Sequence, residues 1–206
     1  APNGVVSGAG TEENPFIIQN WVIDASAANG IEIRNTNMYF IIRNCTISGS
    51  ASYNGISLYN VDNGKIENNT ITGNVRGIAL DQSSGNTISR NTISGNSQYS
   101  IHIWYSPNNT ATGNTVHGNG ICGIAVDFSS NTNIINNTIF DNEQYGVNID
   151  SSVGNVFTGN NITGNDVGMF LGFDTSNTLT NNTVSDSERG ISIFASANII
   201  TGGSVF

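Results

Sequence analysis

The chain contains few charged side chains, and basic ones are especially scarce. Charged residues make up 10% of its 206 residues, with fifteen Asp and Glu but only six Lys and Arg, so that the formal net charge is −9. An average soluble domain is about one quarter charged. Nucleic acids and anionic membranes bind clusters of Lys and Arg, so this composition argues against both as partners.

The sequence also lacks long apolar runs. No stretch of about eighteen apolar residues occurs, and we therefore predict no membrane span. The opening letters APNGVV suit a mature N-terminus from which a signal peptide has been removed. We accordingly expect a secreted protein, located outside the cell or on its surface.

Asparagine, in contrast, is abundant and recurs at a fixed interval. The chain has 34 asparagines, and the stretch NTITGN at 69–74 returns as NTISGN at 91–96, 22 residues later. Pairs of the type Gly-Ile recur every 22 to 25 residues along the chain. A constant period of this size is typical of a solenoid. The eight pairs begin at Gly30, Gly55, Gly77, Ser100, Gly123, Gly146, Gly168 and Gly190.

Within each repeat the apolar residues alternate with polar ones, as they do in a strand. In the second repeat, for example, Ile56 and Leu58 form such a pair, and further apolar positions follow at Ile66 and Ile71. Three short strands per turn, each with inward side chains, describe one coil of a triangular solenoid. The sequence therefore predicts an all-β parallel β-helix of about eight coils of 22–25 residues.

Two columns of asparagine mark the corners of these coils. An amide both donates and accepts hydrogen bonds, so identical side chains one coil apart are expected to form a ladder. Asparagine also tolerates the left-handed backbone of a tight corner. We therefore assign these residues to structure. One column is Cys45, Asn69, Asn91, Asn114, Asn137, Asn160 and Asn182, and the other is Asn74, Asn96, Asn119, Asn142 and Asn165.

The two cysteines occupy different kinds of position. Cys45 replaces an asparagine of the first column, so it is predicted to be a small buried thiol. Cys122 precedes Gly123 at a corner and is predicted to be exposed. Three to four coils separate them, so the expected distance between their Cα atoms exceeds the separation of about 7 Å that a disulfide can bridge. Cys122 is instead a candidate for a disulfide between chains.

The frame GI-x-L…N-x-I…N-x-I…GN over residues 30 to 205 resembles the repeats of NosD-type and carbohydrate-binding and sugar-hydrolase (CASH) β-helix proteins of archaeal and bacterial cell surfaces. The stretch GTEENPFIIQNWVIDASAANGIEIRNT resembles the entry segment of archaeal members and covers the first coil. The resemblance implies a single-stranded right-handed parallel β-helix, which we divide into a capping segment, 1–29, and a repeat domain, 30–206.

A link to copper, which the NosD resemblance implies, is not supported by the residues. The chain has two histidines and two methionines, His102, His117, Met38 and Met169, and their positions give no cluster of soft ligands. We therefore predict no metal and no other cofactor.

Chemistry is expected at outward positions that break the repeat. An exposed Trp flanked by carboxylates suits a sugar, because its flat apolar ring packs on a pyranose face while acceptors bind the hydroxyls. One outward face of coils three to six offers this combination. Its residues are Asp81, His102, Trp104, Tyr105, Asp127, Phe128 and Asp150.

Catalysis at this face has only weak candidates. Asp127 and Asp150 lie in adjacent coils, so their carboxylates are expected about 5 Å apart, near the spacing of a retaining glycosidase pair. Lyase or epimerase action on uronates needs Arg or Lys beside the substrate carboxylate, and we expect none around this patch.

The last predicted strand ends in Val205 and Phe206, an apolar edge that is expected to stack head-to-tail on another copy. From this edge we predict a non-catalytic structural surface protein that self-assembles into a filament, sheath or layer, with further lateral contacts between copies. The alternative is a carbohydrate-binding or carbohydrate-active β-helix, similar to a glycoside hydrolase, that uses the face around Trp104, Asp127 and Asp150.

Overall fold

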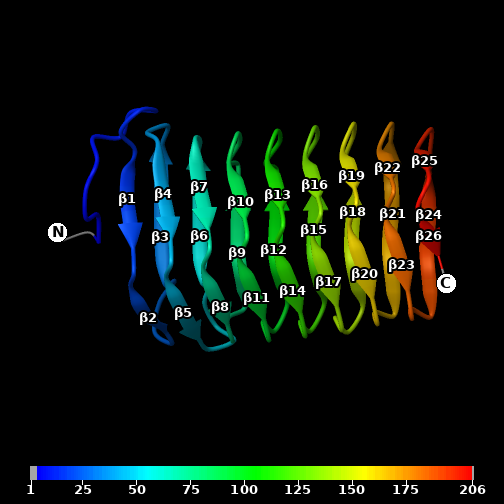
Figure 1. Cartoon of the computed structure of the whole chain (residues 1–206), viewed down its shortest axis with the longest axis horizontal. Coiled ribbons are helices and arrows are strands. Elements are labelled where there is room, and N and C mark those ends of the chain that lie inside the picture. Colours follow the sequence, from blue (N-terminus) through cyan, green and yellow to red (C-terminus); the bar gives the residue numbers. More distant parts are fainter. Residues whose placement is uncertain (1–3, 206) are drawn as a thin grey trace.

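The computed structural model describes residues 4–205, which form an all-β parallel β-helix (Figure 1). Their twenty-six strands lie in three parallel sheets of nine, nine and eight strands. The chain visits the three sheets in turn and then begins the next coil, so each sheet grows by one strand per coil (Figure 1). The predicted fold class is confirmed. Among the described residues, no helix long and apolar enough to cross a membrane is found.

The strands are short and regularly placed. Sheet A contains β1 (Phe16–Gln19), β4 (Phe40–Arg43), β7 (Gly64–Glu67), β10 (Thr87–Ser89), β13 (Thr110–Thr112), β16 (Asn133–Ile135), β19 (Val156–Thr158), β22 (Thr178–Thr180) and β25 (Ile199–Thr201). Sheet B contains β2 (Val22–Ala25), β5 (Thr46–Gly49), β8 (Thr70–Thr72), β11 (Thr92–Ser94), β14 (Thr115–His117), β17 (Thr138–Phe140), β20 (Asn161–Thr163), β23 (Thr183–Ser185) and β26 (Ser204–Val205). Sheet C contains β3 (Ile31–Thr36), β6 (Ile56–Val61), β9 (Arg76–Asp81), β12 (Tyr99–Trp104), β15 (Cys122–Asp127), β18 (Tyr145–Asp150), β21 (Val167–Thr175) and β24 (Arg189–Ser196).

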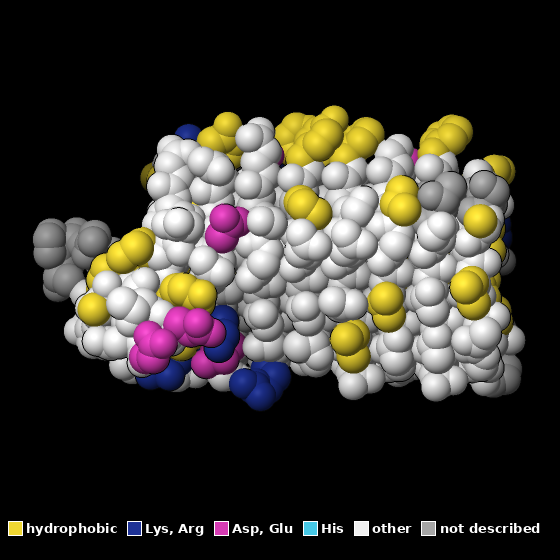
Figure 2. Space-filling model, turned by 90° about the horizontal axis from the view of Figure 1, so that it is seen from above, with side chains coloured by type: hydrophobic (Ala, Val, Ile, Leu, Met, Phe, Trp, Pro, Cys, Tyr) yellow, Lys and Arg dark blue, Asp and Glu magenta, His cyan; other side chains and the backbone are white. Residues whose placement is uncertain are grey.

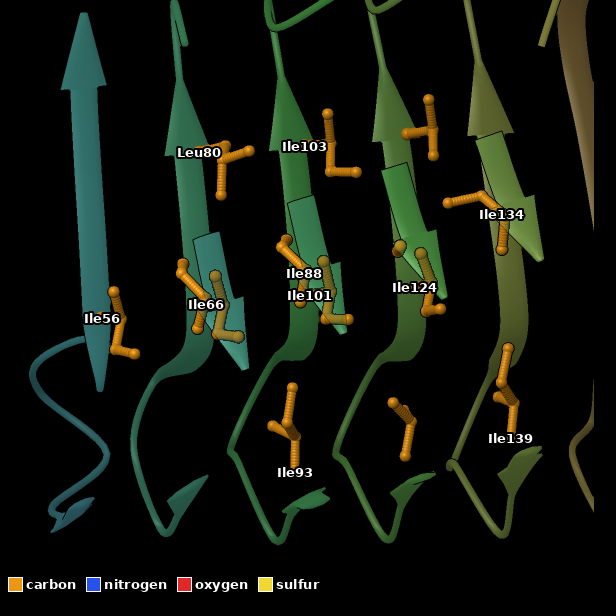
Figure 3. Packing of buried hydrophobic residues seen from close by; sticks show 14 of the residues in the cluster. Ile56, Ile66, Leu80, Ile88, Ile93, Ile101, Ile103, Ile124, Ile134 and Ile139 are labelled. Atoms are coloured by element: carbon orange, nitrogen blue, oxygen red, sulfur yellow. The ribbon is translucent and has the colours of Figure 1, made fainter. Parts of the chain in front are cut away.

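The core consists of aliphatic side chains stacked on their counterparts one coil away (Figure 3). Ile78 pairs with Ile101, and Ile101 with Ile124, in unbroken register. The predicted inward columns are buried through the middle of the solenoid, where Ile88 and Ile93 have 0% exposure. In the last coil the same columns are open, with Ile200 44% and Val205 54% exposed. Each coil therefore relies on the next one to bury its inward side chains.

The glycine that precedes the first inward residue in most strands of sheet C suits this close stacking, and in β12 the small Ser100 takes its place and is buried. A Cβ added at Gly123 would lie 2.6 Å from the carbonyl oxygen of Gly146 and 2.6 Å from the Cγ2 atom of Ile139. Such contacts are well inside van der Waals distance, so a larger residue would force the coils apart. This explains the Gly-Ile pairs from which the repeat was recognised.

The asparagine columns form the predicted ladders. Asn114 Oδ1 accepts hydrogen bonds from the backbone N–H (3.0 Å) and the side-chain amide (3.1 Å) of Asn91. Its own amide donates to Ile88 O (3.0 Å) and Asn137 Oδ1 (3.0 Å). One detail of the prediction is wrong, because the left-handed residue is the one before the ladder position, as at Arg90 (φ 53°). The residue before each ladder asparagine thus makes the turn, and the ladder asparagines supply hydrogen bonds to the backbone of that corner.

The two thiols differ in how well they were predicted. Cys45 is 1% exposed, as expected, and its N–H donates to Asn69 Oδ1 (2.9 Å). The prediction that Cys122 is exposed is wrong, since its exposure is 0%. Cys122 is paired with Tyr99 and Tyr145 of the neighbouring coils, whose larger side chains occupy the surface. This burial removes the basis for a disulfide between chains.

We predict that Asn114→Ala lowers the free energy of unfolding by about 2 kcal/mol or more, because it leaves buried groups of Asn91 and Ile88 unpaired. Asn161→Ala, on the exposed side of β20, is the control and should change stability by less than about 0.5 kcal/mol. Urea denaturation measures both. Equal effects of the two substitutions would contradict the structural role of the ladder.

We also predict that both thiols resist alkylation in the native protein. Burial raises the pKa of the Cys45 and Cys122 thiols, and the thiolate is the reactive form. Iodoacetamide followed by mass spectrometry should show labelling only after denaturant is added. Rapid native labelling of Cys122 would show that its corner is open.

Candidate functional site

The outer face of sheet C brings the predicted site residues together. Asp81, Trp104 and Asp127 are register partners on β9, β12 and β15, and Asp150 follows on β18. His102 lies two positions before Trp104 on the same strand, and its side chain also faces outward. The expected placement on one face is therefore observed.

A buried serine fixes the end of each of these strands. Ser106 Oγ donates to Trp104 O (2.7 Å), and the N–H of Ser106 donates to Ser129 Oγ (2.8 Å) one coil on. The residue between, Tyr105, has a φ of 46°. Both bonds recur at Ser83 after Asp81 and at Ser129 after Asp127, and Ser152 Oγ donates to Asp150 O (2.9 Å). Sequence reasoning missed this column, although Ser83, Ser106, Ser129 and Ser152 recur every 23 residues.

Three aromatic side chains form an exposed ridge at this corner, which we call the aromatic ridge: Trp104, Tyr105 and Phe128. They are 39%, 49% and 46% exposed. The rings of Tyr105 and Phe128 are stacked, with centroids 4.8 Å apart, and Trp104 meets Tyr105 edge-on at 4.9 Å. Figure 2 shows hydrophobic side chains gathered along one rim of the solenoid. An exposed apolar cluster of this kind is a candidate for a binding surface.

The backbone of the ridge is strained. Tyr105 and Phe128 have φ values of 46° and 50°, a region that bulky residues rarely adopt. Such conformations cost free energy and persist where the surrounding structure enforces them. Here the flanking serines enforce them, and the result is that both rings project into solvent.

A pocket of about 230 Å³ lies beside the ridge, lined by residues that include Arg34, Tyr59, Arg76, Asp81, His102 and Trp104. The expectation that no basic side chain lies near this face is therefore wrong. Arg76 stands at the start of β9, in register with Tyr99, and its guanidinium lies over the Tyr99 ring at 5.9 Å. Although Arg76 stands at a corner of the coil, its long side chain places the guanidinium at the outer face of sheet C.

His102 is held in one orientation by its neighbours. Its Nε2 lies 2.9 Å from Asp127 Oδ2, and Asp127 Oδ1 accepts a hydrogen bond from the Asn148 amide (3.1 Å). The imidazole is also stacked on Tyr99, with ring centroids 4.6 Å apart. Burial, together with the charge of Asp127, raises the pKa of the Tyr99 hydroxyl. An oriented histidine in a pocket is equipped to exchange a proton with a ligand.

Asp81 is the pocket residue with a clearly shifted pKa. Burial raises the pKa of its carboxyl above the usual value, while the charges of His102 and Arg76 oppose this rise. In addition, Asp81 Oδ1 and Arg76 Nε are buried and have no hydrogen-bond partner in the structure. Buried polar atoms without partners are uncommon, and here an acceptor and a donor line the same pocket.

The remaining predicted residues contribute less. The carboxylate of Asp127 is hydrogen-bonded to His102 and Asn148, and Asp150 Oδ1 accepts a hydrogen bond from Ser151 Oγ (3.2 Å). The two carboxylates therefore do not form an isolated pair. Val205 lies in the last coil, far along the solenoid from the pocket (Figure 1). Phe206 lies outside the described residues. Within 4–205, no group of three or more His, Cys, Asp and Glu side chains is arranged to hold a metal ion.

Residues 3–156 and 123–206 match the model of the right-handed β-helix region family, and the chain belongs to this family. The match confirms the predicted right-handed β-helix. The NosD-type, CASH and archaeal parts of the resemblance stay predictions. A sequence search of characterised proteins found no significant match.

Several solved structures share the fold. The periplasmic alginate epimerase AlgG superposes with a TM-score of 0.79 at 18% identity, and the match covers 91% of this chain and 50% of the epimerase. The A-module of the Azotobacter vinelandii mannuronan C-5 epimerase AlgE4 gives 0.67 at 16% identity over 96% of this chain and 63% of that one. Pectate lyase Pel9A gives 0.72 at 11% identity over 92% and 68%. The chain thus spans about half the length of the alginate epimerase.

We predict that Asp81→Asn stabilises the protein at neutral pH. The folded-state pKa of Asp81 is raised, so its ionisation costs stability as the pH rises through that value. The gain from Asn should therefore appear above the folded-state pKa and disappear below the unfolded-state pKa. Urea denaturation across a pH series measures the gain. Asp166→Asn, at an exposed corner, is the control, and a gain from Asp81→Asn that did not change with pH would contradict the assignment.

Proposed function

We propose that the chain is a polysaccharide-binding β-helix that holds a linear glycan on the outer face of sheet C. The observation that carries this proposal is the exposed aromatic ridge of Trp104, Tyr105 and Phe128 beside a pocket that Arg76, Asp81 and His102 line. The ridge offers flat apolar surface for pyranose rings, and the pocket offers partners for their hydroxyl or carboxylate groups.

The fold relatives support a glycan as the ligand class. An alginate epimerase, a mannuronan C-5 epimerase and a pectate lyase are named for polysaccharide substrates, and an enzymatically active domain of a phage tailspike is a further structural neighbour. These proteins share the β-helix at low sequence identity. Their substrates therefore guide the choice of test ligands for this chain.

The net charge of the chain and the charges at the pocket have opposite effects on the binding of an acidic glycan. The net charge of −9 repels a long anionic polymer as a whole. At the pocket, however, Arg76 and Arg34 line the same walls as Asp81, and Arg34 is paired with Glu32. Local charge is thus close to balance, and a carboxylated sugar would bind through Arg76. Arg76→Gln tests whether Arg76 binds the sugar carboxylate. If it does, the substitution should weaken binding of alginate or polygalacturonate more than binding of a neutral glucan.

A second candidate function is acid–base chemistry on the bound glycan. The supporting observation is that His102 is oriented by Asp127 while Asp81, with its raised pKa, lies in the same pocket. A carboxyl that stays protonated to higher pH is suited to donate a proton, and an oriented imidazole to accept one. Depolymerisation or epimerisation assays with the His102→Gln and Asp81→Asn variants test this candidate.

Head-to-tail and lateral self-assembly, and an extracellular location, stay predictions. Assembly between copies would bury exposed apolar side chains of the described residues. Sedimentation at increasing protein concentration tests it directly.

We predict that Trp104→Ala weakens glycan binding by about 2 kcal/mol or more, as truncating a central interface aromatic does. Tyr53→Ala is a matched control, because Tyr53 is equally exposed at 39% but lies in the turn between β5 and β6. Affinity electrophoresis and calorimetry with alginate, polygalacturonate and a neutral glucan provide the measurement. If the protein retains none of these glycans, or if both variants bind like the wild type, the proposed site is wrong.

A further inference from the structure

Six stretches of the chain read Asn-X-Thr, the acceptor motif for N-linked glycans in secreted proteins. The repeat itself produces Asn-Thr pairs, so the motif alone does not identify an acceptor. The structure separates the six, because a glycan needs an exposed amide and free space around it. Their asparagines are Asn44, Asn68, Asn108, Asn136, Asn161 and Asn181.

The asparagines of the ladders are excluded by their hydrogen bonds. The amide of Asn137 donates to Ala111 O (3.0 Å) and to Asn160 Oδ1 (3.0 Å), and its side chain is buried. Asn136, directly before it, is exposed. Within residues 4–205, the Asn136 side chain makes no hydrogen bond to the protein. Attachment of a glycan there therefore breaks no hydrogen bond of the fold.

Asn136 and Asn181 stand at the corner between sheets A and B, with φ values of 53° and 54°. One coil after each of them the same corner is a glycine, Gly159 or Gly202. A Cβ added at Gly159 would meet Asn136 Oδ1. A Cβ added at Gly202 would likewise meet Asn181 Oδ1. One coil before them the corner is again a glycine, at Gly113 and Gly159. Each asparagine is therefore flanked along this corner by residues without side chains.

Asn44 and Asn68 stand at the same corner but have larger neighbours. Asn44 is followed one coil later by Asn68, and Asn68 by Arg90. The Arg90 guanidinium lies 3.6 Å from Glu67 Oε2, directly before Asn68 in the chain. Since adjacent coils are only about 4.8 Å apart, these side chains occupy the space that a glycan on Asn44 or Asn68 would need.

The remaining two motifs are also less suited to carry a glycan. Asn108 stands at the corner between sheets C and A, where Asn131 follows one coil later. Asn161 lies on β20, within sheet B and not at a corner. Its motif ends in Thr163, whose hydroxyl donates to Asp186 Oδ2 (3.1 Å). Of the six motifs, two therefore combine an exposed amide with open space on both sides.

We propose that Asn136 and Asn181 carry N-linked glycans. The donor is an oligosaccharide on a polyprenyl diphosphate, which a transferase of the secretory route supplies. The asparagine Nδ2 forms a bond to the anomeric carbon of the sugar and loses one proton. The bond from that carbon to the diphosphate oxygen breaks, and the polyprenyl diphosphate leaves with the electron pair. The inference rests on the predicted extracellular location, because cytoplasmic chains do not meet this transferase.

The two sites form a short row that lies away from the proposed glycan-binding face. Two coils separate Asn136 from Asn181, which corresponds to about 10 Å along the solenoid. Each coil passes from sheet C to sheet A to sheet B, so the corner between A and B is the one that does not border sheet C. Glycans at this corner leave the aromatic ridge exposed.

The test uses the full chain, secreted from cultured mammalian cells behind a cleavable signal peptide. Peptide N-glycosidase in heavy-oxygen water converts each occupied asparagine to a labelled aspartate, and mass spectrometry then gives the occupancy of all six motifs. We expect occupancy at Asn136 and Asn181 well above that at the other four. Asn136→Gln and Asn181→Gln should each remove one glycan, and the control Asn161→Gln should remove none.

A change at the neighbouring corner tests the importance of open space. Gly159→Asn should lower the occupancy of Asn136 in the secreted protein, because the new side chain and a glycan would compete for the same space. Asparagine itself tolerates the left-handed backbone of this corner. Gly154→Asn is the matched control, since Gly154 also has a positive φ (70°) but lies beside Asn131, which is in no motif.

Three results would overturn the inference. The first is a folded, secreted protein in which neither Asn136 nor Asn181 is occupied. The second is equal occupancy of all six motifs, which would show that the open corner selects nothing. The third is an equal effect of Gly159→Asn and Gly154→Asn on the occupancy of Asn136.

Discussion

The structure depends on hydrogen bonds between identical side chains in successive coils. A corner of a solenoid exposes backbone N–H and C=O groups that point inward, where no water compensates them. Asn91 shows the solution, since its N–H and amide both donate to Asn114 while its amide also reaches Ile66 O (2.9 Å). Because each ladder asparagine bonds to the next one, the same side chain recurs from Asn69 to Asn182, and Cys45 takes its place one coil before Asn69.

This constraint separates structure from function along the sequence. Inward positions of the strands stay apolar, although their size varies from Ala111 to Phe157, so polar variation is confined to outward positions and to strand ends. The aromatic ridge lies at such positions. Ser106 and Ser129 each hold the backbone of their corner, and the residue directly before each serine is free to vary. Gln82 occupies the position that Tyr105 and Phe128 occupy one and two coils later. The corner therefore imposes the left-handed backbone whichever residue stands there, and the fold itself does not require an aromatic ring at this position.

The sequence predicted what repeats and failed at what does not. The aliphatic columns and two asparagine ladders followed from period alone, as did the shared face of Asp81, Trp104 and Asp127. Period does not reveal which way a corner side chain turns, and Cys122 and Arg76 were misplaced for that reason. Cys122 is covered by larger neighbours, and Arg76 bends over Tyr99 toward the pocket. The serine column was visible in the spacing but was masked by the many other serines of the chain.

The scarcity of charge makes the pocket on sheet C unusual within this molecule. With 21 ionisable Lys, Arg, Asp and Glu side chains in 206 residues, most of the surface is neutral. Yet Arg34, Arg76 and Asp81 line one pocket, together with His102. Such a grouping is not needed by the coil, because the neighbouring coils fold with Ala125 and Asn148 in the column of His102. Partly buried charges carry a desolvation cost that a neutral side chain would avoid. Their place beside the aromatic ridge therefore supports the proposed glycan site, in which one ligand would contact both surfaces.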